Sequence, residues 1–203
     1  MNQMIVPRTS CAISKDQRQV LDHQNWVPAS GVEVSFDIRH RGTSILLNYF
    51  VQEPQVRAVN TEFNSPVWED SCVEFFIRLE DDPNYYNFEF NAIGTVLGAY
   101  GPDRNSRKPL PVKSLGEITT TPSLGKGIIE TLEGKISWTL GIVIPVAVLV
   151  HSGITDISGQ QAHANFYKCG DKLHQPHFLS WQPVLTDQPN FHLPQHFGEL
   201  RFE

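Results

Sequence analysis

Hydrophobic and polar residues alternate along much of this chain, and the clearest run is residues 71–79. Every second residue from Val73 to Leu79 is apolar, so an extended segment here has one continuous hydrophobic face. The opposite face carries side chains of mixed chemistry, namely Cys72, Glu74, Phe76 and Arg78. The pattern predicts a β-strand whose first face packs in a core and whose second face carries the chemistry.

A second alternating run, residues 85–91, follows a turn at residues 81–84, where Asp, Pro and Asn each favour a reversal of the chain. Pairing the two runs as a hairpin predicts Asn87, Glu89 and Asn91 beside Glu74 and Arg78 on one sheet face. The alternative is that this face is simply solvated.

Further short strands are predicted before and after this hairpin. Residues 32–38 alternate and 44–51 are apolar on both sides, so a turn at Arg39–Gly42 predicts another hairpin. Residues 53–66 are predicted to be a connection with a weak strand near Val56. Later segments complete the pattern: a hairpin of 128–132 and 136–144 around Glu133–Lys135 with Trp138 in the core, a strand at 160–170, and a last strand at 197–202.

Many short strands separated by turn signals predict an all-β fold, an antiparallel β-sandwich of the immunoglobulin-like kind. Residues 31–203 form the sandwich domain in this interpretation. Residues 1–30 are irregular, and we expect them to form an arm packed on the sandwich, with Trp26 as a packing anchor.

Charge and hydropathy exclude some functions. The net charge is −6, the isoelectric point is about 5.7, and no basic patch is present, which argues against nucleic-acid binding. The longest apolar run, residues 142–150, is too short to span a bilayer. No signal peptide is visible, so the sequence as it stands predicts a cytoplasmic chain; a removed leader would make it periplasmic or secreted.

Three widely spaced cysteines form neither a disulfide framework nor a CxxC metal site. We expect Cys72 to be a small buried side chain. A disulfide bridge between Cys11 and Cys169 stays an alternative.

Trp68 precedes the 71–79 strand, close to Glu74. An indole beside strand-borne polar groups suits a hydroxylated ring, because the indole covers sugar C–H groups while a carboxylate accepts from hydroxyls. The alternative is a packing indole and a solvated carboxylate.

The ordered set of these residues resembles the family 9 carbohydrate-binding modules and their DOMON-like relatives. It comprises Trp68, Glu74, Tyr86, Phe88, Phe90, Asn91, Gly94, Trp138, Ile144-Pro145 and Phe197–Leu200. The resemblance implies a β-sandwich that binds sugar, often at a chain end, between two tryptophans. It also implies a short helical turn at 145–150 and an arginine, matched here by Arg104, that reaches the sugar.

Our leading hypothesis is non-catalytic binding of a mono- or oligosaccharide, of the kind found in xylan or cellulose. Trp68 and Trp181 would pack against the two faces of the sugar ring, and Tyr167 is the alternative to Trp181. Glu74 and Asn165 would hold hydroxyls, with help from Arg104. The alternatives are a structural or protein-interaction sandwich, and an accessory protein associated with a glycoside hydrolase.

The sequence supports metal binding and enzymatic activity less well than it supports sugar binding. The resemblance permits a structural calcium ion, for which the oxygen-rich residues are Glu69, Asp70, Asp81 and Asp82. Two further alternatives are bis-histidine haem binding and zinc binding, for which the candidate ligands are His163, His174 and His177. Glu74 and Glu89 could face each other as hydrolase acids, but an open sheet face does not exclude water, and nucleophile and phosphate motifs are absent.

Overall fold

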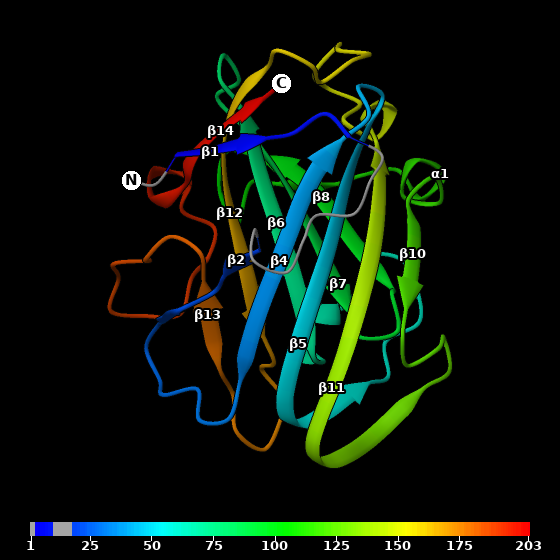
Figure 1. The fold of residues 1–203 in the computed structure, drawn as a ribbon, viewed down its shortest axis with the longest axis vertical. Helices are drawn as coiled ribbons and strands as arrows, with labels where there is room; N and C mark the ends of the chain where they lie inside the picture. Colours follow the sequence, from blue (N-terminus) through cyan, green and yellow to red (C-terminus); the bar gives the residue numbers. More distant parts are fainter. Residues whose placement is uncertain (1–2, 10–17) are drawn as a thin grey trace.

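Two β-sheets pack face to face in the computed structural model, which describes residues 3–9 and 18–203 (Figure 1). The larger sheet has nine strands. Its main path runs β1 (Gln3–Val6), β14 (Gly198–Phe202), β12 (Gln161–Cys169), β6 (Cys72–Leu79), β7 (Tyr85–Asn91), β8 (Val96–Gly101) and β9 (Lys108–Pro109). Two short strands complete it, because β13 (Phe178–Ser180) pairs with β12 and β3 (His23–Gln24) pairs with β13.

The smaller sheet has five strands in the order β10 (Thr119–Pro122), β11 (Ile129–Pro145), β5 (Ser44–Ala58), β4 (Glu33–His40) and β2 (Gln19–Val20). Within the described residues, helical structure is limited to single turns: η2 (Val67–Glu69), α1 (Val112–Leu115), η3 (Val146–Val148) and η4 (Pro194–His196). None of the described helices has the length and apolar character needed to cross a membrane. The all-β sandwich and the helical turn near residue 146 are confirmed.

Two strands are longer than predicted: the weak strand expected near Val56 is the end of β5, and the turn predicted at Glu133–Lys135 is wrong. Residues 53–58 extend β5, and residues 129–145 form one strand, β11, instead of a hairpin. The pairing of β11 with β5 shifts register between Ile129 and Leu132 and between Glu133 and Ile136. Gly134, with a φ of 120°, lies within the second shift, so the Glu133–Lys135 triplet forms an irregularity in a continuous strand and not a turn.

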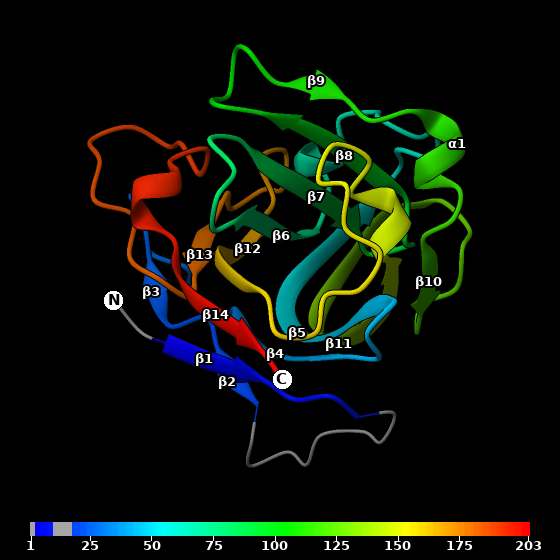
Figure 2. The ribbon, with the colours of Figure 1, turned by 90° about the horizontal axis from the view of Figure 1, so that it is seen from above.

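The N-terminal residues add strands to both sheets. β1 pairs in parallel with the C-terminal β14, β2 pairs with β4, and β3 pairs with β13. Seen from above, β1 and β14 lie together at one side of the sandwich, and α1 lies on the far side (Figure 2). Cys11, one partner of the bridge considered above, falls outside the described residues.

The predicted strand faces are confirmed. Val73, Phe75, Ile77 and Leu79 are buried between the sheets, and Trp138 is buried there too. Three rings form the centre of this core: Phe166 stacks on Phe36 and Phe75, with centroid distances of 3.9 and 5.1 Å. Free cysteine Cys72 is fully buried, as predicted.

The outer face of the nine-stranded sheet is also covered over part of its area. A second apolar cluster lies on it, built from Val67, Cys72, Phe76, Tyr85, Tyr167, Cys169, Val184, Phe191 and Phe197. The chain after β13, residues 181–197, supplies its outer part. The mixed-chemistry face of β6 and β7 is therefore buried rather than solvated, and Asn87 and Asn91 are fully inaccessible.

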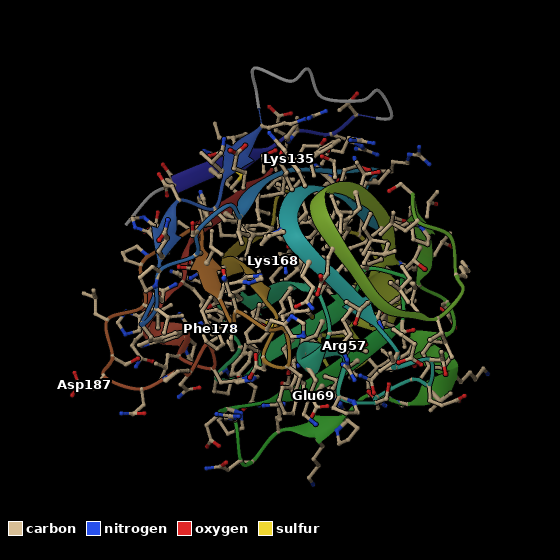
Figure 3. All side chains as sticks on the ribbon, turned by 90° about the horizontal axis from the view of Figure 1, so that it is seen from below. Arg57, Glu69, Lys135, Lys168, Phe178 and Asp187 are labelled. Atoms are coloured by element: carbon tan, nitrogen blue, oxygen red, sulfur yellow. The ribbon has the colours of Figure 1, made fainter. Side chains whose placement is uncertain are left out.

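A buried ionic group lies at one end of the sandwich; we call Glu53, Lys168, His177 and Trp138 the interior charge cluster. The Nζ atom of Lys168 lies 2.9 Å from Oε2 of Glu53 and 2.8 Å from Nε2 of His177. Nε1 of Trp138 donates to Oε1 of Glu53 at 2.7 Å. Figure 3 shows Lys168 near the middle of this end, with Asp187 at the periphery.

Candidate functional site

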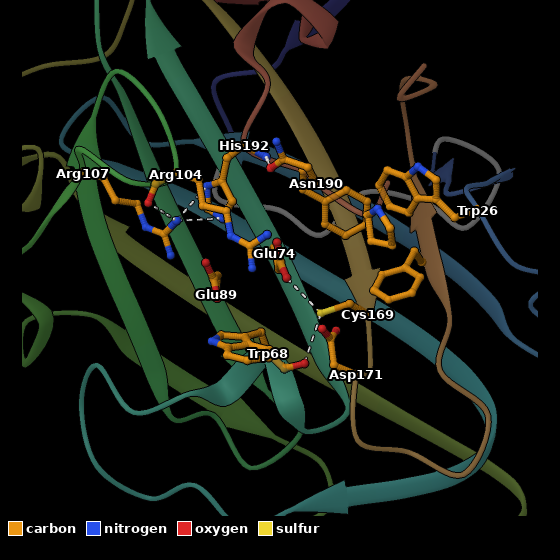
Figure 4. A pocket seen from close by; sticks show the side chains of 13 residues that line it. Trp26, Trp68, Glu74, Glu89, Arg104, Arg107, Cys169, Asp171, Asn190 and His192 are labelled. Atoms are coloured by element: carbon orange, nitrogen blue, oxygen red, sulfur yellow. Dashed lines mark hydrogen bonds between the residues drawn. The ribbon is translucent and has the colours of Figure 1, made fainter. Parts of the chain in front are cut away.

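A pocket opens on the outer face of the nine-stranded sheet, where the second apolar cluster leaves part of β6 and β7 uncovered (Figure 4). We call it the Trp68 pocket. Its lining combines aromatic, acidic and basic side chains: Trp26, Trp68, Phe178, Phe191, Glu74, Glu89, Asp171, Arg104, Arg107, Cys169, Pro189, Asn190 and His192. Strands β6 and β7 contribute two of the acids, Glu74 and Glu89, whereas Asp171 and most of the other lining residues lie outside strands.

The floor consists of two carboxyl groups. Glu74 and Glu89 are direct partners across the β6–β7 pairing and are only 3% and 2% exposed. Oε1 of Glu89 accepts from the Asn87 amide at 3.0 Å, and Oε1 of Glu74 accepts from the Cys169 thiol at 3.0 Å. Oε2 of Glu89 is buried without a protein hydrogen-bond partner. A buried acceptor of this kind is available to a ligand.

Burial changes the protonation of both acids. It raises the pKa of Glu74 well above its ordinary value, and the negative charge of Glu89 adds to this effect. Burial also raises the pKa of Glu89 to about 7, although the Arg107 guanidinium opposes the shift. The pair therefore titrates as a coupled unit that can both accept and donate hydrogen bonds near neutral pH.

Trp68 forms one wall of the pocket from the single turn η2. Its indole is half-buried, and Figure 4 shows it on one side of the two carboxyl groups. The turn is fixed from behind by Asp70, which is fully buried and pairs with Arg57. Asp70 also accepts from the backbone N–H groups of residues 59 and 60 and from the Asn91 amide.

Basic groups form the opposite wall. Arg104 is exposed, and Nη1 of Arg107 lies 3.0 Å from Nε2 of His192. Burial and, to a smaller extent, the charge of the nearby Arg107 lower the pKa of His192 to about 2, so the imidazole is neutral. The hydroxyl of Tyr85 lies 2.9 Å from Nδ1 of the same ring. This side of the pocket therefore carries positive charge on the arginines alone.

An aromatic group closes the end of the pocket. The ring of Trp26 packs against Phe178 and Phe191 at centroid distances of 5.5 and 5.3 Å, and its Nε1 donates to the Thr186 carbonyl at 2.7 Å. Trp26 has a φ of 63°, a left-handed conformation that is rare for a bulky residue. Such strain persists only where surrounding contacts determine the conformation.

Three predicted ligand residues, Trp68, Glu74 and Arg104, come together in this pocket. Trp181 does not join them. It is 4% exposed and packs edge-on against Phe166 in the main core, with centroids 5.7 Å apart. Its expected place as the second tryptophan near the site is taken by Trp26, from the N-terminal region.

The structure also keeps Asn165 and Tyr167 away from the pocket. Both are fully buried on the outer face of β12. The Asn165 amide exchanges hydrogen bonds with the backbone of Gln182, and the Tyr167 hydroxyl donates to the Phe191 carbonyl. These side chains hold the covering segment 181–197 in place, and neither of them lines the Trp68 pocket.

Sequence reasoning missed several lining residues, among them Trp26, Arg107, Asp171, Asn190 and His192. Most lie in loops and are distant in sequence from Trp68. Of these residues, only Arg107 could have been suggested by the sequence, because it lies in the same loop as the predicted Arg104.

The acidic residues considered for calcium do not form one group. Asp70 is saturated by nitrogen donors, and Glu69 pairs with Lys172 at 2.9 Å. Asp81 and Asp82 lie beyond the other end of β6, and an eight-residue strand spans about 25 Å. Calcium binding by either pair stays a prediction.

The histidines considered for haem or zinc do not all lie together: His174 and His177 line one pocket, and His163 does not. His163 pairs with Arg78 near the start of β12, whereas His177 contacts Lys168 near its end. His174 is exposed and lies 3.4 Å from Glu133. Among the described residues these histidines join no group of three or more potential metal ligands, and haem or zinc binding stays a prediction.

Comparisons with known proteins agree with this geometry. A sequence profile described as "Carbohydrate-binding family 9" matches residues 9–202. A solved structure from Bacteroides uniformis ATCC 8492, described as a "putative carbohydrate-binding protein", is similar over 99% of both chains, with 40% identity and a TM-score of 0.92. No curated protein matches the chain.

Two more distant structures share the fold. Both are family 9 carbohydrate-binding modules from Caldicellulosiruptor kristjanssonii, one in complex with glucose and one with cellotriose. Their identities are 12% and 11% and their TM-scores 0.62 and 0.64; the matches cover 100% of this chain, and 96% and 94% of theirs. Because the family profile spans nearly the whole sequence, this chain belongs to carbohydrate-binding family 9, a family of non-catalytic carbohydrate-binding modules.

Proposed function

We propose that the Trp68 pocket is the carbohydrate site and that it binds the terminal glucose unit of a short β-linked oligosaccharide. One observation carries this proposal: a half-buried indole lies in the same pocket as two buried carboxyl groups, one with a free acceptor oxygen. The glucose and cellotriose bound by the two Caldicellulosiruptor modules support the choice of sugar.

Each wall of the pocket would make a different kind of contact with the sugar. The Trp68 indole would cover the C–H face of the sugar ring. This contact buries apolar area but does little to orient the sugar. Glu74 and Glu89 would accept from adjacent hydroxyls, and Arg104 would donate to a hydroxyl or ring oxygen. The Trp26 side chain closes the far end, so a chain terminus fits this pocket better than the middle of a chain.

The affinity should be modest, with a Kd of roughly micromolar to millimolar, because one or two sugar units bury few atoms. Titration calorimetry with glucose, cellobiose and xylobiose tests the proposal. We expect binding of glucose and cellobiose by the unmodified chain, and at least a tenfold loss in Trp68→Ala and in Glu74→Gln.

Phe63→Ala is the matched control, because Phe63 is an exposed aromatic residue outside the pocket, and we expect it to bind like the unmodified chain. Unchanged binding in both Trp68→Ala and Glu74→Gln would show that the sugar binds elsewhere. A folded protein that binds none of the three sugars would contradict the proposed ligand.

A further inference from the structure

Three side chains with metal-binding chemistry meet beside the Trp68 pocket, and two of them, Glu74 and Cys169, line it. The two sulfur atoms of Cys72 and Cys169 and a carboxyl oxygen of Glu74 all lie within 4.8 Å of one another. Over residues 3–9 and 18–203 this is the one group of three or more Cys, His, Asp or Glu side chains that meets this spacing. We call it the Cys72–Glu74–Cys169 triad.

The backbone fixes this arrangement. Cys72 and Cys169 are direct partners in the antiparallel pairing of β6 with β12, so their side chains leave the sheet side by side. Glu74 follows Cys72 by two residues and therefore points to the same face. Paired strands in the middle of a nine-stranded sheet supply all three groups, so forming the triad requires no ordering of a loop.

The donor set determines which ion it suits. Two thiolates and one carboxylate favour Zn²⁺ and similar thiophilic divalent cations over Ca²⁺ or Mg²⁺, which take oxygen ligands. Tetrahedral zinc with Zn–S of about 2.3 Å and Zn–O of about 2.0 Å places its ligand atoms roughly 3.5–3.8 Å apart. The Cys169 sulfur and Glu74 oxygen are 3.0 Å apart, so small side-chain movements would suffice.

We propose that the Cys72–Glu74–Cys169 triad binds one thiophilic divalent cation of the zinc type, with a fourth coordination position facing the Trp68 pocket. Cys169 and Glu74 both line this pocket, which gives the ion a route of entry and leaves room for a water molecule as the fourth ligand. Three protein ligands and one open position are typical of zinc sites that exchange a ligand.

Binding must displace protons. Each thiol loses its proton to solvent as its sulfur coordinates, and so does Glu74 where it is protonated, because it coordinates as a carboxylate; the hydrogen bond from Cys169 to Glu74 is replaced by two bonds to the ion. The loaded triad carries one net negative charge, and Arg104 and Arg107 lie across the same pocket. If the proposed sugar site is correct, the ion also takes Glu74 from the sugar, so metal and sugar affinities are coupled.

Metal titration of the full chain tests the site without any sugar. Reduced protein, freed of metal with a chelator, is titrated with Co²⁺ while the sulfur-to-cobalt charge-transfer absorption is recorded, and then with Zn²⁺ in competition. We expect one equivalent of Co²⁺ to produce this absorption, Zn²⁺ to abolish it, and protons to be released. Cys72→Ser and Cys169→Ser should each bind at least tenfold more weakly.

Cys11→Ser is the matched control, because it removes the third thiol and should leave the titration unchanged. Glu74→Gln, which keeps both sulfurs, covers the case in which a serine variant fails to fold; we expect it to retain the thiolate absorption with weaker affinity. The proposal is overturned if reduced wild-type protein shows no such absorption, or if Cys11→Ser alone removes it. A sugar titration repeated with Zn²⁺ tests the coupling separately.

Discussion

Two groups of buried charged side chains lie on opposite faces of the nine-stranded sheet, and they differ in how their charges are matched. In the interior charge cluster, Glu53 faces a lysine and an indole N–H, and Lys168 is bonded on several sides. In the Trp68 pocket, Glu74 faces a second carboxyl group, and Glu89 retains a buried oxygen without a protein partner.

This difference separates a structural role from a binding role. Buried charges that satisfy one another hold two sheets together, because removing either partner leaves the other unpaired. Buried acids that repel each other lower stability, and they persist where a ligand or an ion uses them. The comparison predicts that substitutions in the cluster reduce stability, whereas substitutions in the pocket change binding.

Lys168→Met should have the largest effect on stability. It leaves the Glu53 carboxylate buried without its counter-charge, which lowers the free energy of unfolding by about 3–5 kcal/mol. Urea denaturation of the purified chain measures this change. The double variant Lys168→Met with Glu53→Gln should recover part of the loss; a single variant as stable as the unmodified protein would show that the pair contributes no net stability.

Trp138→Phe should have an intermediate effect. Phenylalanine keeps most of the core packing but removes the N–H that donates to Glu53, at a cost of about 1–3 kcal/mol for the unsatisfied acceptor. The same urea titration measures it. Trp181→Phe is the comparison, because Trp181 is also buried in the main core while its indole makes no described hydrogen bond to an acid, and it should cost less.

The pH dependence of stability should have opposite signs in the two groups. Burial lowers the pKa of His177 from 6.5 to about 3, so between these values the unfolded chain binds more protons and stability falls as pH decreases. Burial raises the pKa of Glu89 from 4.5 to about 7, so in that window the folded chain holds more protons and stability falls as pH increases.

Unfolding at a series of pH values, with a chelator present, separates the two contributions. His177→Gln should flatten the decline on the acidic side, and Glu89→Gln should flatten the decline between about pH 4.5 and 7. If the stability of a variant changes with pH in parallel with that of the unmodified protein, the substituted residue is not the source of the pH dependence assigned to it.

Glu89→Gln should have the smallest effect on stability at pH 7. Removing one of two facing acids relieves their repulsion, and an amide fits the same space, so we expect a change within about 1 kcal/mol and a gain rather than a loss. Sugar affinity should fall by at least threefold in the calorimetric titration. A large loss of stability would mean that Glu89 has a structural role like that of Glu53.

Most of the strands and both faces of β6 and β7 could be predicted from the sequence. Alternation with a period of two is a local property, so the position of Glu74 opposite Glu89 follows from one hairpin and its turn. The continuous β11 was missed because a glycine-containing irregularity within a strand and a turn between two strands have similar sequences.

The members of the pocket were harder to predict. Trp68 and Glu74 are neighbours in sequence, whereas Trp26 reaches the pocket from the N-terminal region and His192 from the segment after β13. Both Trp26 and Trp181 follow short strands of a sheet edge, and nothing in the local pattern indicates which indole turns toward the core.

The sequence by itself determined most of the strands, the two faces of β6 and β7, and the residues that could carry chemistry on the second face. The tertiary structure alone decided that this second face is covered by residues 181–197, that Trp26 and not Trp181 borders the pocket, and that two cysteines distant in sequence flank Glu74. The physical reason is that periodicity fixes which way a side chain leaves its own strand, whereas its neighbours depend on which strands pair and which segments pack over them.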